Sequence, residues 1–560
     1  MFSFFIRRLF SRERTQRADD VVLHPEEGPA DTQTRLENSI RELLDRAEHA
    51  HRRLDMKEAA RCFQAALALK TDNANALKGL GEVLRKQGRH VEAELYLNLA
   101  LDYAPTDRMA TDSLLSLLIE TRKLGQAEAL LARLAPRSPD DPDLQLFAAR
   151  IRVAREGASS AVPLYSRILE KAPDHARTKE FLGNTYARLG EVEKALEILS
   201  QVTTSHPDRA LSRYYYSIHL LKAGRFREGL LHHESRLDLP GSRDTPYDLQ
   251  LVFHTMKQAV RRIPPWQRDD RLSGKRLLIW REQGLGDCLM MLRFLSVVRA
   301  HNPAKISLLL DPSLILIAHE MGIADEIISI PTWNSTGQVE RDDLFDLQCS
   351  FMSLPWLLDC ALEATGSYVP YLQAPASSTW QWLEPLRSST HPRVGLVWAG
   401  NPELAEDGAR SLHFRALQPL FSLPDIQFVS LQYGHARQQI HDAGLDIPLI
   451  DLMDNCTSFA ETAAVIQELD LIIAVDTAVV HLAGGLGKTV WMLNRSGSEW
   501  RWMLGRCDSP WYPAMQIFNQ ASDEDWATVI ARVADALQSF VTSSSHAVPP
   551  TVRPSMRSVG

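Results

Sequence analysis

The first half of the chain is patterned as amphipathic helices whose small and apolar positions recur every 34 residues. An alanine returns at this step, an aromatic or leucine residue follows it by four positions, and a proline closes successive units. One repeating unit of two helices explains all three columns, so the pattern predicts an α-solenoid of about six repeats over residues 37–237. The columns are Ala59, Ala93, Ala127, Ala161 and Ala195; Phe63, Leu97, Leu131, Tyr165 and Leu199; and Pro105, Pro139, Pro173 and Pro207.

This period resembles the tetratricopeptide repeat (TPR). Gly81 and Gly183 each lie twelve residues before the alanine of their unit, where one helix passes close to the next and a small residue is required. Repeats of this kind stack into a curved solenoid whose concave face binds a peptide or protein. The resemblance therefore implies a macromolecular partner on that face.

From Lys275 onward the pattern changes to short apolar strands alternating with helices, which indicates parallel sheets with crossover helices. One series starts with strands at 277–280 and 306–310, and another with strands at 394–398, 426–431, 471–475 and 490–493. The stretch 374–392 between them is rich in Pro and Ser, which is typical of a hinge. We predict lobes at 275–390 and 391–545 facing a cleft, a junction at 238–274, and tails at 1–36 and 546–560, the latter disordered.

Composition removes several classes of protein. Apolar residues make up 45% and charged residues 24%, as in ordinary soluble domains, and the net charge of −8 argues against a nucleic-acid partner. The six cysteines form no CxxC pair, so neither a zinc site nor a disulfide framework is indicated, and a reducing cytoplasm fits best. No stretch is long and apolar enough to span a bilayer. The N-terminal MFSFFIRRLF is either a frayed tail or a peripheral membrane contact.

Two glycine-rich motifs do not hold up as nucleotide-binding fingerprints. Gly284-x-Gly286 follows a strand, but Leu289 stands where a dinucleotide-binding loop has its third glycine. Gly487-Lys488-Thr489 imitates the end of a P-loop, yet Leu482 replaces the required first glycine. The sequence thus favours neither a dehydrogenase nor a P-loop enzyme.

A third motif, DTAVVHLAG from Asp476 to Gly484, follows a fully apolar strand directly. Its residues Thr477 to Val479 open a helix at the carboxyl edge of a sheet, where free backbone N–H groups suit a diphosphate. Asp476 and His481 then lie close enough to hold sugar hydroxyls or phosphate. The alternative is that Asp476 caps the helix and His481 is a satisfied polar residue on its flank.

Several blocks resemble, in family order, the TPR-linked bacterial glycosyltransferases: WREQGLGDCLMMLRFL, VGLVWAGNPELAEDGARSLHF, SLQYG, LDLIIAVDTAVVHLAGGLGK and EWRWMLGRCDSPWYP. The catalytic part of that family is similar to the ADP-heptose:lipopolysaccharide heptosyltransferases and, more distantly, to O-GlcNAc transferase. The resemblance covers about residues 210–540. It implies a GT-B-like pair of Rossmann-like lobes, with the acceptor on the first and a nucleotide-sugar donor on the second.

The resemblance also assigns roles to particular residues. It places Asp287 at the general base of an inverting, metal-independent displacement, while the residues alone allow Asp287 to be a helix cap instead. A late block holding Trp500, Arg501, Asp508 and Trp511 either encloses the donor or folds back over the hinge. The donor-binding residues implied by the resemblance are Asn401, Arg410, Ser411, Gln432, Asp476, Thr477, Ala478 and His481.

The sequence therefore predicts a cytoplasmic glycosyltransferase that uses a nucleotide-sugar as substrate and needs no metal or other cofactor. Its TPR region would select a protein acceptor, and TPR-linked flagellin glycosyltransferases, which share this architecture, make flagellin one candidate acceptor. A lipid or glycan acceptor, as in heptosyltransferases, and a non-catalytic TPR scaffold remain as alternatives.

Overall fold

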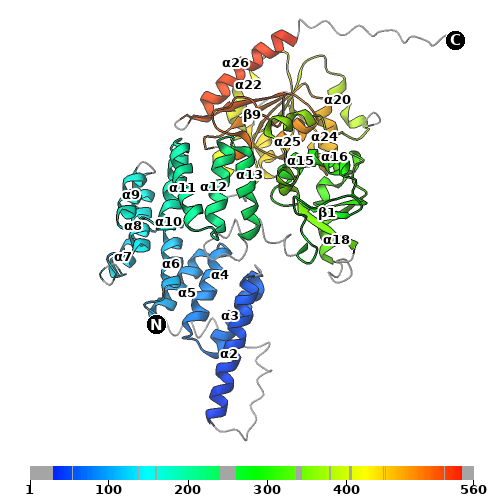
Figure 1. Cartoon of the computed structure of the whole chain (residues 1–560). Coiled ribbons are helices and arrows are strands. Elements are labelled where there is room, and N and C mark those ends of the chain that lie inside the picture. Colours follow the sequence, from blue (N-terminus) through cyan, green and yellow to red (C-terminus); the bar gives the residue numbers. More distant parts are fainter. Residues whose placement is uncertain are drawn as a thin grey trace, which may run out of the picture. The chain divides into compact units, whose positions relative to one another are not determined.

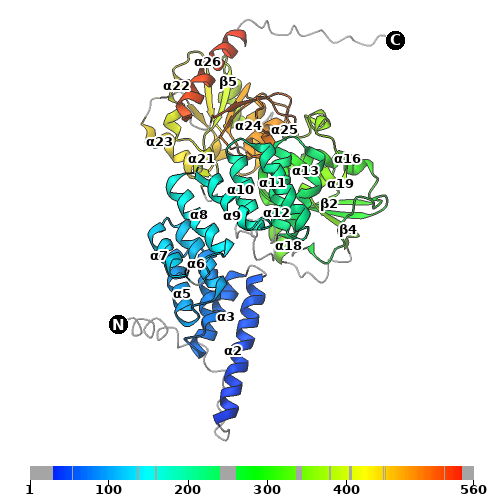
Figure 2. The same cartoon turned by 60° about the vertical axis from the view of Figure 1, so that its left-hand side comes forward.

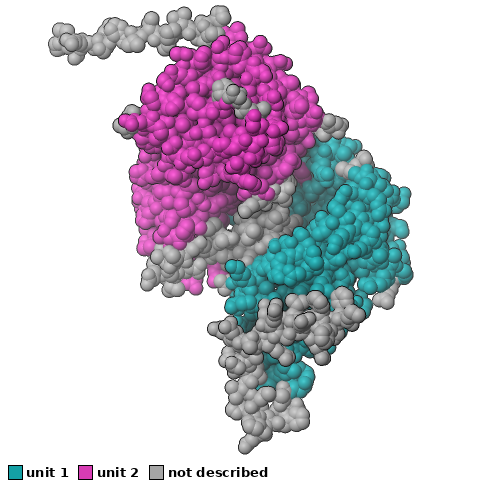
Figure 3. Space-filling view, turned by 180° about the vertical axis from the view of Figure 1, so that it is seen from behind, with its two compact units in different colours: residues 1–215, 237–254 teal, residues 216–236, 255–560 magenta. Residues whose placement is uncertain are grey.

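A computed structural model describes residues 29–52, 55–134, 136, 138–157, 160–239, 260–335, 344–376, 380–402, 407–444, 447, 449–497, 499–521 and 524–544. The predicted C-terminal tail, residues 1–28 of the N-terminal tail and most of the predicted junction lie outside these ranges. The chain forms two compact units, residues 1–215 with 237–254 and residues 216–236 with 255–560 (Figure 3). Each unit is described by itself below.

The first unit consists of helices arranged as successive pairs (Figures 1 and 2). Helix α2 begins at Pro29, inside the segment predicted as a tail, and its buried Ala47 and Ala50 pack in the same apolar cluster as the following helices. The helices are α2 (Pro29–Arg52), α3 (Met56–Leu69), α4 (Ala74–Lys86), α5 (His90–Tyr103), α6 (Arg108–Glu120), α7 (Leu124–Leu134), α8 (Pro142–Glu156), α9 (Ala161–Lys171), α10 (Ala176–Arg188), α11 (Val192–Ser205) and α12 (Ala210–Lys222), whose second half belongs to the other unit.

The repeated columns of the sequence form the interior of this unit. The alanines are fully buried, and a Cβ on Gly81 would approach Leu97 Cγ to 2.8 Å, just as one on Gly183 would approach Leu199 Cγ to 2.7 Å. Asn73, Asp107 and Asp141 cap their helices by accepting backbone N–H groups. The repeat is therefore the unit of packing, as the sequence predicts.

The second unit begins with the end of α12 and helix α13 (Phe226–His233), the last of the repeat series. Leu221, Phe226 and Leu230 belong to the same buried cluster as strand β1, and Phe226 meets Trp511 edge to face with ring centroids 5.6 Å apart. The last helix of the repeats thus covers the α/β part and shares its core.

Two parallel sheets form the α/β part (Figure 1). The four-stranded sheet has the order β3-β2-β1-β4 and the six-stranded sheet the order β10-β9-β8-β5-β6-β7. Counted from β5, the second order is the one of the Rossmann fold, whose strand order reverses between β5 and β8; in the first sheet the reversal lies between β1 and β4. The predicted fold class, a helical TPR solenoid followed by two Rossmann-like lobes, is confirmed.

The strands of the first lobe are β1 (Arg276–Trp280), β2 (Lys305–Leu310), β3 (Glu326–Ser329) and β4 (Leu347–Ser350). Those of the second lobe are β5 (Arg393–Val397), β6 (Gln427–Ser430), β7 (Leu449–Asp451), β8 (Leu471–Val475), β9 (Val490–Asn494) and β10 (Met515–Asn519). The main helices around the site are α15 (Leu285–Met291), α16 (Leu295–Ala300), α21 (Asp407–Arg410), α24 (Phe459–Gln467) and α25 (Ala478–Gly485), and α26 (Trp526–Ser544) covers the second sheet.

Candidate active site

The candidate site lies where the loops after β1, β5 and β8 meet. Each of these strands borders the place where the order of its sheet reverses, which is where open parallel sheets bind ligands. Helix α15 from the first lobe packs directly on helix α25 from the second. A Cβ on Gly286 would lie 2.7 Å from His481 Cδ2 and 3.3 Å from Ala478 Cα, so this approach requires a glycine.

Asp287 stands in the first turn of α15 and serves two functions at once. Its Oδ2 accepts the backbone N–H of Gly284 at 3.0 Å, which resembles the predicted capping role. Its Oδ1 forms an ion pair with Arg501 Nη2 from the second lobe, and the Asp287 side chain is only 13% exposed. Capping and a place in the site are therefore compatible.

Arg501 belongs to the late block, and the structure places this residue in the site. It is 8% exposed, its Cζ lies 4.8 Å from the centre of the Trp500 ring, and its Nη2 donates to Gln283 Oε1 at 3.2 Å. Burial opposes the charged form, yet the carboxylates of Asp287 and Glu499 outweigh burial and raise the pKa of Arg501. The guanidinium therefore stays charged.

His481, expected at the diphosphate and sugar site, is 4% exposed on α25. Its Nδ1 shares a hydrogen bond of 2.9 Å with Tyr512 Oη, and its ring stacks on Trp502 with centroids 5.2 Å apart. Burial, followed by the charges of Arg501 and Arg293, lowers the pKa of His481 well below its ordinary value. His481 is thus a neutral residue that holds the start of α25 in place.

Asp476 directly follows strand β8, beside the start of α25. Burial and the neighbouring Glu499 raise the pKa of the Asp476 carboxyl, while the nearby Trp502 indole and Arg501 act in the opposite direction. Arg410 Nη1 donates to the backbone oxygen of Asp476 at 3.1 Å. The predicted donor residues Asp476 and Arg410 are therefore brought together.

Arg410 is held firmly on the loop that follows β5. Its Nε donates to Asp407 Oδ1 at 2.9 Å, and a Cβ on Gly400 would lie 2.4 Å from Arg410 Nη2. Ser411 Oγ donates to Asp407 Oδ2 and accepts the Gly400 N–H, both at 2.9 Å. Asn401 is exposed on the same loop. The segment after β5 therefore holds the Arg410 guanidinium in a fixed position beside the carboxyl end of β8.

Gln432 is 2% exposed, and its whole amide is bonded to backbone. Its Oε1 accepts the N–H groups of Trp398 and Ala399 at 3.0 and 2.9 Å, and its Nε2 donates to the oxygens of Ala399 and Tyr433 at 3.0 and 2.9 Å. Because an amide has two donors and one acceptor oxygen, nothing remains for a ligand. Gln432 therefore orders the backbone of the loop after β5.

Three residues that the sequence interpretation did not select complete the site: Arg293, Trp502 and Tyr512. Arg293 is 1% exposed and donates from Nη1 to the backbone oxygens of Thr365 and Trp511 at 2.9 and 2.8 Å. It thereby ties the first lobe to the late block. The sequence signal that could have selected Trp502 and Tyr512 was the run of aromatic residues in the late block. That run suits both a segment that encloses the donor and one that folds back over the hinge.

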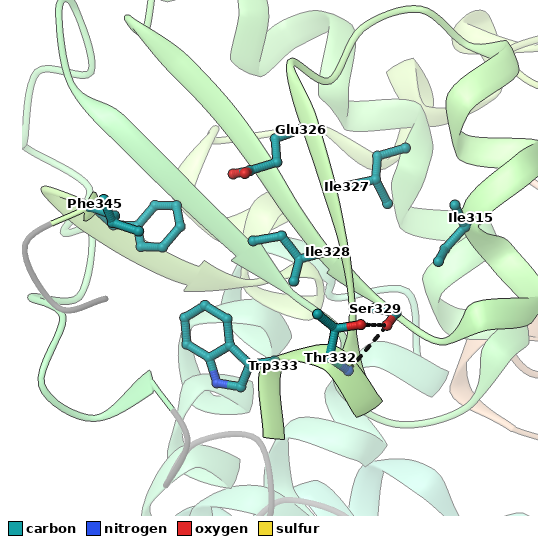
Figure 4. Close-up of a pocket in the computed structure, with 9 residues that line it drawn as sticks. Ile315, Glu326, Ile327, Ile328, Ser329, Thr332, Trp333 and Phe345 are labelled. Atoms are coloured by element: carbon teal, nitrogen blue, oxygen red, sulfur yellow. Dashed lines mark hydrogen bonds between the residues drawn. The ribbon is translucent and has the colours of Figure 1, made fainter. Parts of the chain in front are cut away.

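A separate hollow of about 510 Å³ lies at the edge strand β3, lined by residues such as Ile327, Ile328, Trp333 and Phe345 (Figure 4). Among the described residues that line it, Glu326 is the one ionisable residue, and none is a predicted site residue. It does not coincide with the site described above.

Comparisons with known proteins bear on the two halves unequally. Two family models described as tetratricopeptide repeat match residues 44–108 and 154–228. The N-terminal half carries tetratricopeptide repeats. Protein FlbA of Caulobacter vibrioides (strain ATCC 19089 / CIP 103742 / CB 15) is 28% identical over 509 residues, which cover 87% of this chain and 82% of FlbA.

The solved structures similar to parts of the chain include a TPR protein and a glycosyl transferase. YrrB, described as a TPR protein with an unusual peptide-binding site, is 23% identical with a TM-score of 0.23, covering 32% of this chain and 95% of its own. A family 9 glycosyl transferase from Veillonella parvula DSM 2008 is 12% identical with a TM-score of 0.38, covering 49% of this chain and 99% of its own. In the described part of this chain, no helix is long and apolar enough to cross a membrane.

Proposed function

We propose that the chain is an inverting glycosyltransferase that moves a sugar from a nucleotide-sugar donor to a protein hydroxyl without a metal ion. One observation carries the proposal: the Asp287 carboxylate pairs with Arg501, its helix α15 packs on α25, and Arg410 bonds to the backbone just before α25. The resemblance of the sequence blocks to TPR-linked glycosyltransferases supports the same reaction.

The chemistry is a single displacement. Asp287 accepts the proton of the acceptor hydroxyl as its oxygen attacks the anomeric carbon of the donor sugar. The bond from that carbon to the diphosphate oxygen breaks, and its electron pair leaves with the nucleoside diphosphate. Because attack comes from the face opposite the leaving group, the anomeric configuration inverts.

The departing diphosphate needs positive charge, and the second lobe can supply it. The backbone N–H groups of Thr477, Ala478 and Val479 lie at the N-terminus of helix α25, and Arg410 lies beside them. We assign Asp476 to the sugar hydroxyls and Asn401 to the open rim of the donor site. Ser411, Gln432 and His481 then act as positioning residues, consistent with their buried or fully bonded side chains.

We further propose that the TPR unit selects the acceptor protein, with flagellin as one candidate acceptor. The first helices of successive repeats carry linked charges: Lys78 pairs with Asp107 at 2.8 Å, and Arg177 with Asp143 at 2.8 Å. Such an alternating surface suits a polypeptide with its own mixed charges better than a uniformly charged polymer.

Turnover of a panel of sugar nucleotides tests the proposal. The wild type should release nucleoside diphosphate from at least one donor, and Asp287→Asn should lower the transfer rate about 10²- to 10⁴-fold because the base is lost. Asp442→Asn, an exposed position away from the site, is the matched control and should keep the wild-type rate. An Asp287→Asn enzyme that retained half its rate would remove Asp287 from the mechanism.

Two further outcomes decide the finer points. Because the protein cations neutralise the diphosphate, EDTA should leave the rate unchanged, and a rate lost with EDTA and restored by Mn²⁺ would overturn the metal-free displacement. Transfer to a lipid or glycan alone would favour the heptosyltransferase-like alternative, and no turnover of any donor would favour the scaffold.

A further inference from the structure

Arg501 occupies an unusual place because one guanidinium faces carboxylates from both lobes. Asp287 of the first lobe pairs with its Nη2, Glu499 lies 3.6 Å from its Nη1, and Asp476 lies near enough to help raise its pKa. The Arg501 side chain thus joins the late block of the second lobe to helix α15 of the first lobe through an ion pair.

Unpartnered donors gather around this residue. Arg501 Nε and Thr477 Oγ1 are buried atoms without a hydrogen-bond partner, and the Trp502 indole lies beside the Asp476 carboxyl. Trp502 stacks on His481 of helix α25, and Thr477 is the residue that begins that helix, so Thr477 and Trp502 both belong to the α25 end of the site. Buried donors without acceptors cost about 1–3 kcal/mol each, and a ligand rich in acceptor oxygens removes that cost.

Arg410 and Arg501 differ in what holds them. Arg410 is fixed by Asp407 and by the backbone oxygen of Asp476, both of which belong to its own lobe. The strongest partner of Arg501 is Asp287, a group that the reaction itself needs unpaired, because a carboxylate held by a guanidinium is a weaker base. The two arginines therefore cannot have the same role.

We propose that Arg501 is a positioning residue that leaves the Asp287 carboxylate for the donor diphosphate when the donor binds. This inference rests on the proposed function and deepens it. A diphosphate carries more negative charge than one carboxylate and offers oxygens to the fork of the guanidinium, so it competes successfully for Arg501. Asp287 is then released to accept the proton of the acceptor hydroxyl. Donor binding thus frees the Asp287 carboxylate to act as the base, and for this reason the donor binds before the acceptor.

The test is a double-mutant cycle on binding of inorganic pyrophosphate to the full chain, measured by titration calorimetry. Asp287→Asn frees Arg501 from its competitor and should tighten pyrophosphate binding about three- to tenfold. Arg501→Gln should weaken binding about 10- to 100-fold. In the Arg501→Gln background, Asp287→Asn should change the affinity less than about twofold, because the exchange no longer exists.

Controls separate the exchange from general charge effects. Arg506→Gln removes the same charge from a half-buried position of the same segment, paired with Asp508, and should leave the affinity within about twofold. Arg501→Lys keeps the charge without the fork and should fall between wild type and Arg501→Gln. If Arg501→Gln alone folds poorly, the double variant is compared with Asp287→Asn, and a pyrophosphate affinity that does not fall below that of Asp287→Asn would show that Arg501 does not bind the diphosphate, which overturns the exchange.

The inference is overturned if Asp287→Asn tightens binding equally with and without Arg501, or if wild type does not bind pyrophosphate. Failure of the exchange and failure of the proposed function give different results. Additive variants in a chain that turns over a sugar nucleotide overturn the exchange alone. A coupled cycle in a chain that turns over no sugar nucleotide overturns the transferase and keeps the exchange of Arg501 between carboxylate and diphosphate.

Discussion

Arg236 and Glu282 form a two-point ion pair, with Nε to Oε1 at 2.8 Å and Nη2 to Oε2 at 3.0 Å. Arg236 is 0% exposed and follows the last repeat helix, and Glu282 lies in the loop between strand β1 and helix α15. Ser353 Oγ also accepts from Nη2 at 2.7 Å, and Glu234 Oε1 accepts from Nη1 at 2.6 Å. The end of the repeats is thus bonded to the loop that leads into the helix of Asp287.

Breaking this pair should destabilise the second unit strongly. Arg236→Met leaves the Glu282 charge buried, so we expect the free energy of unfolding to fall by about 3–5 kcal/mol in urea titrations. Arg225→Met removes a half-exposed arginine paired with Glu228 nearby and should cost less than about 1 kcal/mol. Equal losses in both variants would show that the buried pair is not special.

Gly286→Ala tests the close packing of α15 on α25. The added Cβ would meet His481 at 2.7 Å, so α15 and its Asp287 must move away from the donor site. We expect sugar transfer to fall at least about 10-fold, since displacements near 1 Å in a site have effects of this size. Gly408→Ala, where a Cβ meets nothing within 4 Å, should leave the rate near wild type. A fully active Gly286→Ala enzyme would contradict the packing.

Buried neutral histidines make the second unit sensitive to acid. Burial is the main cause that lowers the pKa of His219 to about 4 and that of His233 and His481 well below the ordinary value. The unfolded chain binds protons on these side chains below about pH 6.5, whereas the folded chain does not. Stability therefore falls as the pH decreases from about 6.5 towards 4, by up to about 1.4 kcal/mol per pH unit for each histidine.

Urea unfolding at pH 7 and pH 5 measures this slope. His219→Gln should reduce the slope by about one third, because one of three histidines no longer takes up a proton on unfolding. His441→Gln, at an exposed position, is the control and should have the wild-type slope. A pH-independent free energy of unfolding between these values would refute the assignment of neutral buried imidazoles.

Removal of the TPR unit tests the division of labour. A chain of residues 208–560 keeps α12 and α13, whose Leu221, Phe226 and Leu230 belong to the α/β core, so it should fold. Because Asp287, Arg410 and Thr477 all remain, donor hydrolysis should match that of the full chain. Transfer to the native acceptor should be lost, as measured by mass spectrometry of acceptor protein incubated with each enzyme. Transfer at the full rate would assign the repeats to assembly or localisation instead.

The repeats and the strands could be predicted from the sequence because both are local patterns. A TPR unit packs only against its neighbours, so a fixed step in small and apolar residues specifies its structure. The positions of Asp476, directly after β8, and of Asp287, at the start of the helix after β1, were also predictable, since the segment that follows a buried parallel strand lies at the carboxyl edge of its sheet. The residues next to Asp287 and Asp476 in the sequence, which predict the preceding strands, are therefore enough to predict these positions.

Only the tertiary structure determined which of these residues work together. Asp287 and Arg501 pair across two lobes, and nothing in the pattern around Arg501 distinguished an enclosing segment from one folded over the hinge. Gln432 looked available for a ligand until its four backbone hydrogen bonds were seen. Ion pairs and hydrogen bonds act over a few ångströms in space and are indifferent to separation along the chain, so periodicity, which records neighbours, cannot reveal them.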